Sequence, residues 1–312
     1  MKALLVVSAA ALAASLGFLV ASCGSDGDAT SAGPVPSVGT TTEGTSEEIP
    51  TTTSGETTET ETEPENGTDT EPSGSNVTYQ VFFTSADGLF VTYRTEPATP
   101  RVGTAALESL LEGPDSFEMG YGLRTEIPDG TQLLGLEIEG EIARVDLTSE
   151  FEAGGGLASK QARLAQIVYT ITQFPTVKGV LFSLDGEPIG VPKGESIIDR
   201  PVTRRDYAGQ LPAILVTSPA LNQAVESPIV LRGSANVFEA NVGIQVLDEN
   251  GDVIVETFTT ATCGTGCRGT FRARVDYEVD QEQDGTIVVH DDDTVGTGTF
   301  PNEVRIPVRL LP

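Results

Sequence analysis

The chain has 312 residues, of which 46 are acidic and 18 basic, and its formal net charge at pH 7 is −28. A surface this acidic repels phosphate backbones, so nucleic acid is excluded as a partner. With one histidine and three cysteines, the chain also has few residues that could ligate a metal ion or form a nucleophilic catalytic triad.

The first 23 residues have the pattern of an export signal with a lipid attachment site. Lys2 precedes the uncharged apolar run Ala3–Val20, and the small pair Ala21-Ser22 precedes Cys23. Because the cysteine thiol receives a diacylglyceryl group before cleavage, we expect residues 1–22 to be a lipoprotein signal peptide. Cys23 then anchors the chain to the outer face of the bacterial cell membrane. An uncleaved transmembrane helix is the alternative, since about 18 apolar residues just cross a bilayer.

Residues 23–76 read as a lipidated cysteine followed by an acidic linker. The linker is rich in Thr, Ser, Gly, Pro and Glu and has no Lys, Arg or aromatic residue. It cannot bury a core, so we expect a disordered tether, serving as a plain spacer or also carrying O-linked sugars. Its carboxylates are Asp26, Asp28, Glu43, Glu47, Glu48, Glu56, Glu59, Glu61, Glu63, Glu65, Asp69 and Glu71.

From residue 77 the sequence becomes that of a folded domain. Thr99 is predicted to cap a helix with Pro100 in its first turn, and Ser159 to open a second helix that ends before Pro175. Between and around these helices, alternating apolar residues predict strands. Their order indicates an α+β domain in which both helices cover one face of a mixed sheet. The strands are expected at 78–84, 90–95, 134–138, 143–147 and 180–184.

Two of these strands define a candidate interaction face. Their apolar residues, which include Leu134 and Ile138, are expected to face the helices, because one face of such a sheet is buried. The alternating polar residues then lie on the opposite face and mix both charge signs, which a neighbouring molecule could complement. This face consists of Glu137, Glu139, Arg144 and Asp146.

Four collinear segments of this region resemble the GerMN domain, a family named for sporulation and spore-germination proteins. They are Glu108–Pro114, Leu123–Thr131, Val145–Phe151 and Gln166–Pro175. The resemblance covers residues 77–207. It implies a non-catalytic assembly module, similar in shape to ring-building domains of secretion machinery, for which self-association is one mode of action.

Residues 211–312 are predicted to form a second domain of about seven short strands, which is typical of a β-sandwich. A two-residue hairpin turn of the primed type is expected at Asn250-Gly251. Four segments resemble the immunoglobulin-like domain associated with GerM-type proteins: Val216–Pro219, Gly233–Ala240, Cys263–Gly269 and Asn302–Val308. Tryptophan is absent, so the Cys…Trp…Cys core of antibody domains is not available and the strand order stays open. The strands are expected at 214–217, 229–234, 241–247, 253–260, 270–276, 286–290 and 304–310.

The residues that could bind a metal ion or a phosphate group also have purely structural interpretations. Cys263 and Cys267 are a close pair in an oxidising compartment, and we expect a disulfide rather than a metal site, because zinc would need four N or S ligands. The segment from His290 to Asp293 could hold Ca²⁺ or Mg²⁺, but a solvated loop is favoured. Gly154–Gly156 suggests a phosphate loop without the Walker spacing, and a flexible lead-in to the helix is favoured.

The sequence thus favours a non-catalytic adaptor of the bacterial envelope. Its expected partners are the membrane, through the lipid anchor, and other envelope proteins or peptidoglycan; no cofactor and no metal are expected. The alternative is a cell-wall-active hydrolase or a solute-binding sensor. A carboxylate-based hydrolase would need a cleft that raises the pKa of one acid, which the sequence alone does not exclude.

Overall fold

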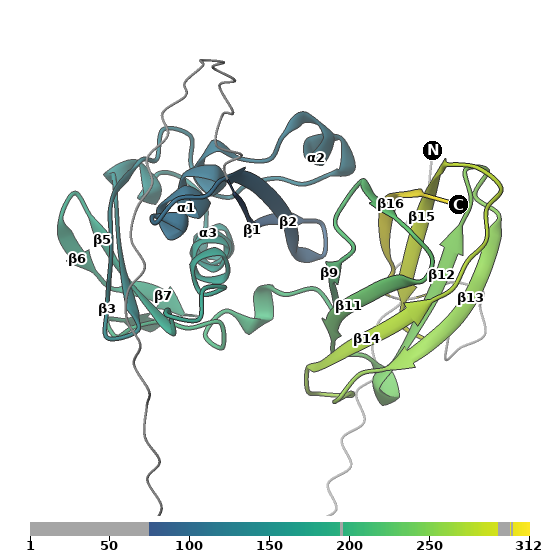
Figure 1. Ribbon diagram of the computed structural model, residues 1–312. Coiled ribbons are helices and arrows are strands. Elements are labelled where there is room, and N and C mark those ends of the chain that lie inside the picture. The colour runs from purple at the N-terminus through teal and green to yellow at the C-terminus, as the bar shows by residue number, and fades with distance from the viewer. Residues whose placement is uncertain (1–74, 194–195, 293–299, 301) are drawn as a thin grey trace, which may run out of the picture. The chain divides into compact units, whose positions relative to one another are not determined.

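The computed structural model describes residues 75–312, apart from 194–195, 293–299 and 301 (Figure 1). The predicted signal peptide, Cys23 and nearly all of the acidic linker lie outside the described residues. Among the described helices, none combines the length and the apolar character needed to cross a membrane.

The first domain contains three α-helices and eight strands among its described residues. Strands β3 to β6 form a four-stranded mixed sheet in that order, in which β4 and β5 run parallel. The elements are β1 (Asn76–Ser85), β2 (Gly88–Pro97), α1 (Val102–Glu112), α2 (Ser116–Tyr121), β3 (Leu133–Glu139), β4 (Ile142–Leu147), α3 (Leu157–Ile171), β5 (Gly179–Leu184), β6 (Glu187–Ile189), β7 (Val191–Lys193) and β8 (Ser196–Ile198).

The predicted mixed sheet is confirmed, but the β1–β2 hairpin does not belong to it. The hairpin is a separate two-stranded sheet, and α1 and α3 lie between it and the four-stranded sheet (Figure 1). The helices are therefore covered on two sides, which explains why nine consecutive residues of α3, Arg163–Ile171, are buried.

Polar side chains of α3 and of the residues just after it replace a strand partner along the outer edge of β1. Gln173 exchanges two hydrogen bonds of 2.7 Å with the backbone N and O of Gln80. Thr170 Oγ1 accepts from Phe82 N at 3.2 Å, and Gln166 Nε2 donates to Phe82 O at 3.1 Å. Gln166 and Thr170 lie at helical spacing on one face of α3, and Gln173 follows just after the helix. Together they satisfy the backbone groups of Gln80 and Phe82, and Arg124 pairs with Thr84 further along the same edge.

Both main helices begin elsewhere than the sequence predicts. Thr99 does not cap α1; its hydroxyl accepts a hydrogen bond from Arg101 N in the preceding turn, and the helix begins at Val102. Helix α3 begins at Leu157, two residues before Ser159. A cap is predicted only from hydrogen bonds between residues close in sequence, whereas packing of the helix against neighbouring elements decides at which residue it begins.

The glycine-rich segment before α3 is held at its beginning by a side chain of that helix. Arg163, only 3% exposed, donates from its guanidinium to the backbone carbonyls of Phe151, Ala153 and Gly154. Gly154 has a φ of 59°, the left-handed conformation that glycine adopts without strain. The segment is thus wrapped around a buried cation that satisfies its carbonyl groups.

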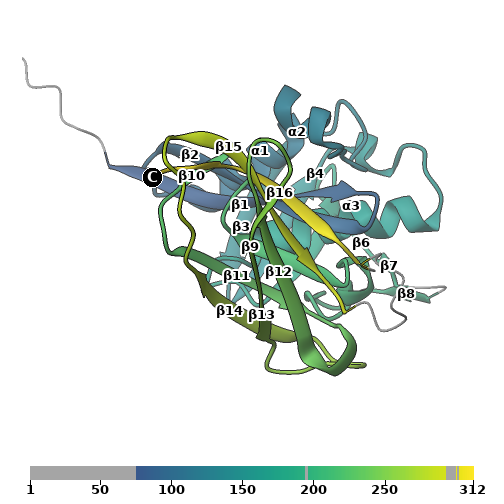
Figure 2. The same cartoon turned by 90° about the vertical axis from the view of Figure 1, so that its right-hand side faces the viewer.

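The second domain is a β-sandwich, as expected. A five-stranded sheet in the order β10-β16-β15-β12-β13 faces a three-stranded sheet in the order β14-β11-β9 (Figures 1 and 2). All seven predicted strands are present; β10, which pairs parallel with β16, was not predicted. The bounds are β9 (Ile214–Ser218), β10 (Gln223–Val225), β11 (Ile229–Ala235), β12 (Asn241–Leu247), β13 (Val253–Thr260), β14 (Gly269–Val275), β15 (Gln283–His290) and β16 (Val304–Leu310).

The primed turn predicted at Asn250-Gly251 is wrong. Only Gly251 of the pair has a positive φ, 84°. The Asp248 carboxylate accepts from the backbone N of Asn250 at 2.9 Å and of Asp252 at 2.8 Å, so a longer loop is organised by one side chain. The primed type, with two positive φ values, occurs instead at Gly140-Glu141 and Asp185-Gly186.

Candidate functional site

The structure brings the four predicted interaction residues to the face of the four-stranded sheet that lies away from the helices. Glu137 of β3 is the direct cross-strand partner of Arg144 of β4. Glu137, Glu139 and Arg144 are exposed, whereas the alternate residues of β4, Ala143 and Val145, are fully buried. An opposite-charge pair directly across two strands stabilises their register modestly.

Asp146 differs from the other three residues of this face. It is half-buried, and its Oδ1 accepts a hydrogen bond of 3.0 Å from Gly186 N in the turn between β5 and β6. Its carboxylate therefore already closes a turn of its own domain. The part of the face available to a partner is carried by Glu137, Glu139 and Arg144.

Strand β3 also forms an open edge of this sheet, a feature that the sequence did not reveal. Among the described strands it pairs only with β4. The prediction that Leu134 and Ile138 are buried is wrong, since they are 50% and 46% exposed. Helix α1 covers Leu136, which packs so close to Gly103 that a Cβ at that position would lie 3.1 Å from Leu136 Cδ2. The helix leaves the side chains of Leu134 and Ile138 uncovered. The alternating pattern is the same for covered and uncovered positions, so it could not distinguish them.

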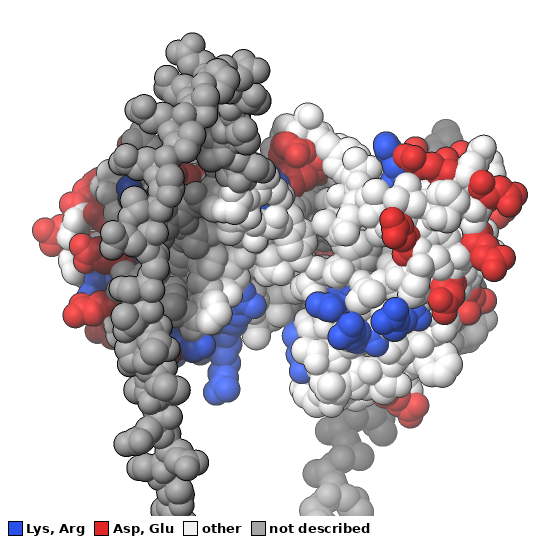
Figure 3. Space-filling model, in the orientation of Figure 1, with Lys and Arg blue, Asp and Glu red and all other residues white. Residues whose placement is uncertain are grey.

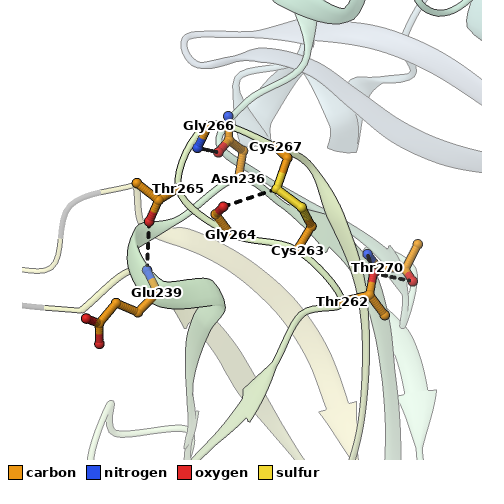
Figure 4. The surroundings of a disulfide bond; sticks show 9 residues. All are labelled: Asn236, Glu239, Thr262, Cys263, Gly264, Thr265, Gly266, Cys267 and Thr270. Atoms are coloured by element: carbon orange, nitrogen blue, oxygen red, sulfur yellow. Dashed lines mark hydrogen bonds between the residues drawn. A yellow bond between two sulfur atoms is a disulfide. The ribbon is translucent and has the colours of Figure 1, made fainter. Parts of the chain in front are cut away.

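The predicted disulfide is present between Cys263 and Cys267, whose Cα atoms are 5.8 Å apart (Figure 4). It closes the loop between β13 and β14. Thr265 Oγ1 accepts from Glu239 N at 3.0 Å, which docks the loop on the segment that precedes β12. A Cβ at Gly264 would lie 2.1 Å from Ala240 N, so only glycine permits this approach.

Reduction of this disulfide is expected to lower the free energy of unfolding by about 2 kcal/mol, the chain-entropy value for a loop this short. The measurement is urea denaturation of wild type and of a Cys263→Ser/Cys267→Ser variant, together with thiol titration of the native wild-type protein. Two free thiols in the native protein, or equal stability of both proteins, would contradict the bonded and stabilising role.

His290, the last residue of β15, and Asp291 do not lie in the solvated loop that was favoured, and Asp293 lies outside the described residues. His290 is 6% and Asp291 8% exposed. Asp291 accepts from Phe238 N at 3.3 Å and from Asn302 Nδ2 at 3.2 Å, and the His290 ring stacks on Phe300 at 3.7 Å. These side chains fasten the end of the strand to neighbouring segments. In the described part of the chain no group of three His, Cys, Asp or Glu side chains is placed to hold a metal ion.

Two domains thus define the class of protein. The first is an α+β domain with an open sheet edge, and the second is an immunoglobulin-like sandwich in which a disulfide closes one loop. Residues 80–190 match the family described as "Sporulation and spore germination". Residues 213–297 match the "Immunoglobulin-like domain of bacterial spore germination". The chain therefore combines a GerM-type domain of the sporulation and spore-germination family with a C-terminal immunoglobulin-like domain of the spore-germination type.

Three solved structures that are similar to parts of this chain come from Bacillus subtilis and Clostridium perfringens. The first GerMN domain of the sporulation protein GerM from Bacillus subtilis is 24% identical over 41% of this chain and 98% of its own, with a TM-score of 0.35. The tandem GerMN domains of that protein are 15% identical over 66% and 64%, with a TM-score of 0.37. A Clostridium perfringens protein described as a presumed lipoprotein is 21% identical over 42% and 89%, with a TM-score of 0.31. No match to the sequence of a curated protein was found.

Proposed function

We propose that the protein is a lipid-anchored, extracytoplasmic lipoprotein that acts as a non-catalytic assembly adaptor in the bacterial envelope. The observation that carries the proposal is the open edge of β3 beside the exposed charges of Glu137 and Arg144. The lipid anchor at Cys23 is supported by the sequence pattern around that residue.

An open strand edge is suited to binding another chain. Its free N–H and C=O groups can pair with an added strand, and exposed apolar side chains beside it add contact area. Leu134 and Ile138 supply that area here. Mixed charges on the adjoining face can select the partner and its register. The partner is an envelope protein, peptidoglycan or a second copy of this domain.

The buried charges of the first domain serve its architecture, which supports a non-catalytic role. Hydrogen bonds from Arg200, and next from Lys193 and Thr203, hold the pKa of Asp206 well below its usual value, against the opposing effect of burial. Asp206 thereby joins the β7–β8 hairpin to the end of the domain. Arg94 and Glu118 form a second such pair at 2.7 Å, between β2 and α2.

Arg144→Glu is expected to reduce recovery of the partner several-fold without unfolding the domain. The reversal places two like charges opposite each other at Glu137, which disfavours a partner selected by mixed charge. An exposed strand position should change stability by only about 0.5 kcal/mol. The measurement is cross-linking in intact cells followed by pull-down, with the melting temperature of each purified protein.

Arg205→Glu provides the matched control, because it makes the same charge change at an exposed residue outside the four-stranded sheet. Equal recovery from Arg144→Glu and wild-type cells would remove this face from the mechanism. A collapse of the melting temperature would assign Arg144 a structural role instead.

A further inference from the structure

Three exposed arginines gather on the outer face of the three-stranded sheet in the immunoglobulin-like domain. Arg232 of β11 lies directly opposite Arg272 of β14, and Arg274 follows two residues further along the same face. Figure 3 shows a group of blue side chains where Figure 1 places β11 and β14. We call these three residues the arginine face.

The arginine face is set apart within an acidic domain. Residues 211–312 contain 15 acidic and 6 basic residues, yet β9, β11 and β14 carry no Asp or Glu. The other three arginines are engaged: Arg305 and Arg309 form ion pairs with glutamates, and Arg268 donates to the backbone carbonyls of Ser234 and Pro212. Unpaired positive charge is thus concentrated on one sheet face.

Nothing in the described part of the domain neutralises these charges. No carboxylate of a described residue lies within 4.0 Å of the guanidinium groups of Arg232, Arg272 or Arg274, including Asp276, which follows β14 directly. Like charges directly opposite each other across two strands are destabilising. An anion lying along this face would relieve that repulsion.

The positive charge continues along the two strands as a narrow strip. Thr270 and Ser234 lie opposite each other in the row beside the Arg232–Arg272 pair, and Arg268 donates to the Ser234 hydroxyl at 3.1 Å. From Thr270 to Arg274 the strip extends roughly 13 Å at the rise of a β-strand. It therefore offers guanidinium and hydroxyl groups to a row of anions rather than to a single one.

We propose that the arginine face binds a linear phosphodiester polymer of the bacterial envelope. The planar guanidinium group donates two parallel hydrogen bonds to a phosphate, which suits arginine to this ligand better than lysine. Arg272 and Arg274 repeat every ~6.6 Å along β14. A polymer carries one charge in each repeating unit, so several weak contacts form at once and add to the affinity.

The ligand that fits best carries its charge in the main chain. A phosphodiester group is part of the polymer backbone, so a chain lying along the strip brings its charges to the arginines directly. A glutamate carboxylate stands at the end of a flexible side chain, and fixing that side chain costs conformational entropy. An acidic peptide is therefore a poorer ligand for this face.

The composition of the face also distinguishes a polymer from a lipid surface. None of the exposed large hydrophobic side chains in the described part of the chain lies on β9, β11 or β14. A surface that lies on a membrane usually adds apolar or aromatic side chains to its cations. The arginine face lacks them, which favours a ligand outside the lipid.

The net negative charge of the chain does not prevent this contact. At physiological salt, charges more than about 8 Å apart are largely screened. A thin polymer chain on the strip therefore interacts mainly with the arginines, whereas a broad nucleic acid duplex also meets the carboxylates of the same domain. The inference rests on the extracytoplasmic location in the proposed function, but it does not rest on the β3 edge.

The test is the binding of fluorescently labelled poly(glycerol phosphate) to the purified chain, with Cys23→Ser to keep it in solution. Replacing Arg232, Arg272 and Arg274 together by glutamine is expected to raise the Kd about ten-fold. It should also reduce the slope of log Kd against log salt concentration by about two, because each contact with a single-stranded polyanion contributes about 0.7. Both quantities are measured by fluorescence anisotropy. Arg274→Gln alone is the second variant and should reduce the slope by about 0.7.

The matched control is Arg101→Gln/Lys178→Gln/Arg205→Gln, which removes three exposed cations from the other domain and changes the net charge equally. Its Kd and salt slope should equal those of the parent chain, and melting temperatures confirm that each variant is folded. An unchanged Kd in the arginine-face variant would overturn the proposal. An equal loss of affinity in the control variant would also overturn it, because net charge alone would then govern binding.

Two further probes identify the source of the anion. Poly-glutamate should bind more weakly than poly(glycerol phosphate), and vesicles of phosphatidylglycerol should not bind through the arginine face. Equal or tighter binding of poly-glutamate would overturn the proposal in favour of an acidic protein segment. Vesicle binding that the three substitutions abolish would overturn it in favour of the membrane surface. Glu137 and Arg144 are unchanged in every variant, so these results do not depend on the β3 edge.

Discussion

Gln166→Leu is expected to destabilise the GerMN domain by about 3 kcal/mol, since each buried polar group left unpaired costs about 1–3 kcal/mol. Gln166 is fully buried in α3. Its Nε2 donates to Phe82 O at 3.1 Å and its Oε1 accepts from Glu126 N at 2.8 Å. Leucine occupies a similar volume but leaves that carbonyl and that N–H without partners.

The measurement is urea denaturation monitored by circular dichroism, with the midpoint and slope fitted separately. At this domain size the melting temperature should fall by roughly 10 °C. Gln132→Leu is the matched control, because this glutamine is exposed and should tolerate the same change. A loss below 1 kcal/mol for Gln166→Leu would show that the edge of β1 does not depend on α3.

Cys23→Ala is expected to abolish lipid attachment completely and to leave an uncleaved precursor. The reason is chemical, because the diacylglyceryl group is transferred to the Cys23 thiol and the peptidase acts only on the modified chain. Loss of the acyl chains also removes about 0.8 kcal/mol of membrane affinity for each buried methylene. The measurement is metabolic labelling with a tagged fatty acid, followed by cell fractionation.

The double variant Cys263→Ser/Cys267→Ser is the control for this experiment, since it removes the other two thiols and leaves Cys23. It should label like the wild type. Labelling and normal maturation of Cys23→Ala would reject the lipoprotein interpretation and leave the apolar run at residues 3–20 as a transmembrane helix.

Local patterns in the sequence determined the order of the elements and the fold class. The strands Asn241–Leu247, Val253–Thr260 and Val304–Leu310 were predicted with the bounds that the structure has. Alternation of apolar and polar residues is a property of one strand alone, so it is readable without the fold. For the same reason Glu137 and Arg144 could be placed on one face. Cys263 and Cys267 lie close enough in sequence for their pairing to be predicted.

Contacts between distant segments were decided only by the tertiary structure. The separation of the β1–β2 hairpin from the main sheet depends on Gln166, Thr170 and Gln173, which read locally as ordinary residues of a helix. The burial of Asp291 likewise depends on Phe238, 53 residues away in the sequence. Hydrogen bonds of this kind leave no periodic signal.

The exposed strand faces show the same division. Alternation along β14 places Arg272 and Arg274 together, but only the register with β11 sets Arg232 opposite Arg272. Likewise, the sequence of β3 predicts its two faces, whereas its position at the edge of the sheet exposes Leu134 and Ile138. The alternation of apolar and polar residues in a strand indicates which side faces the core. Only tertiary packing decides where the core and the sheet end.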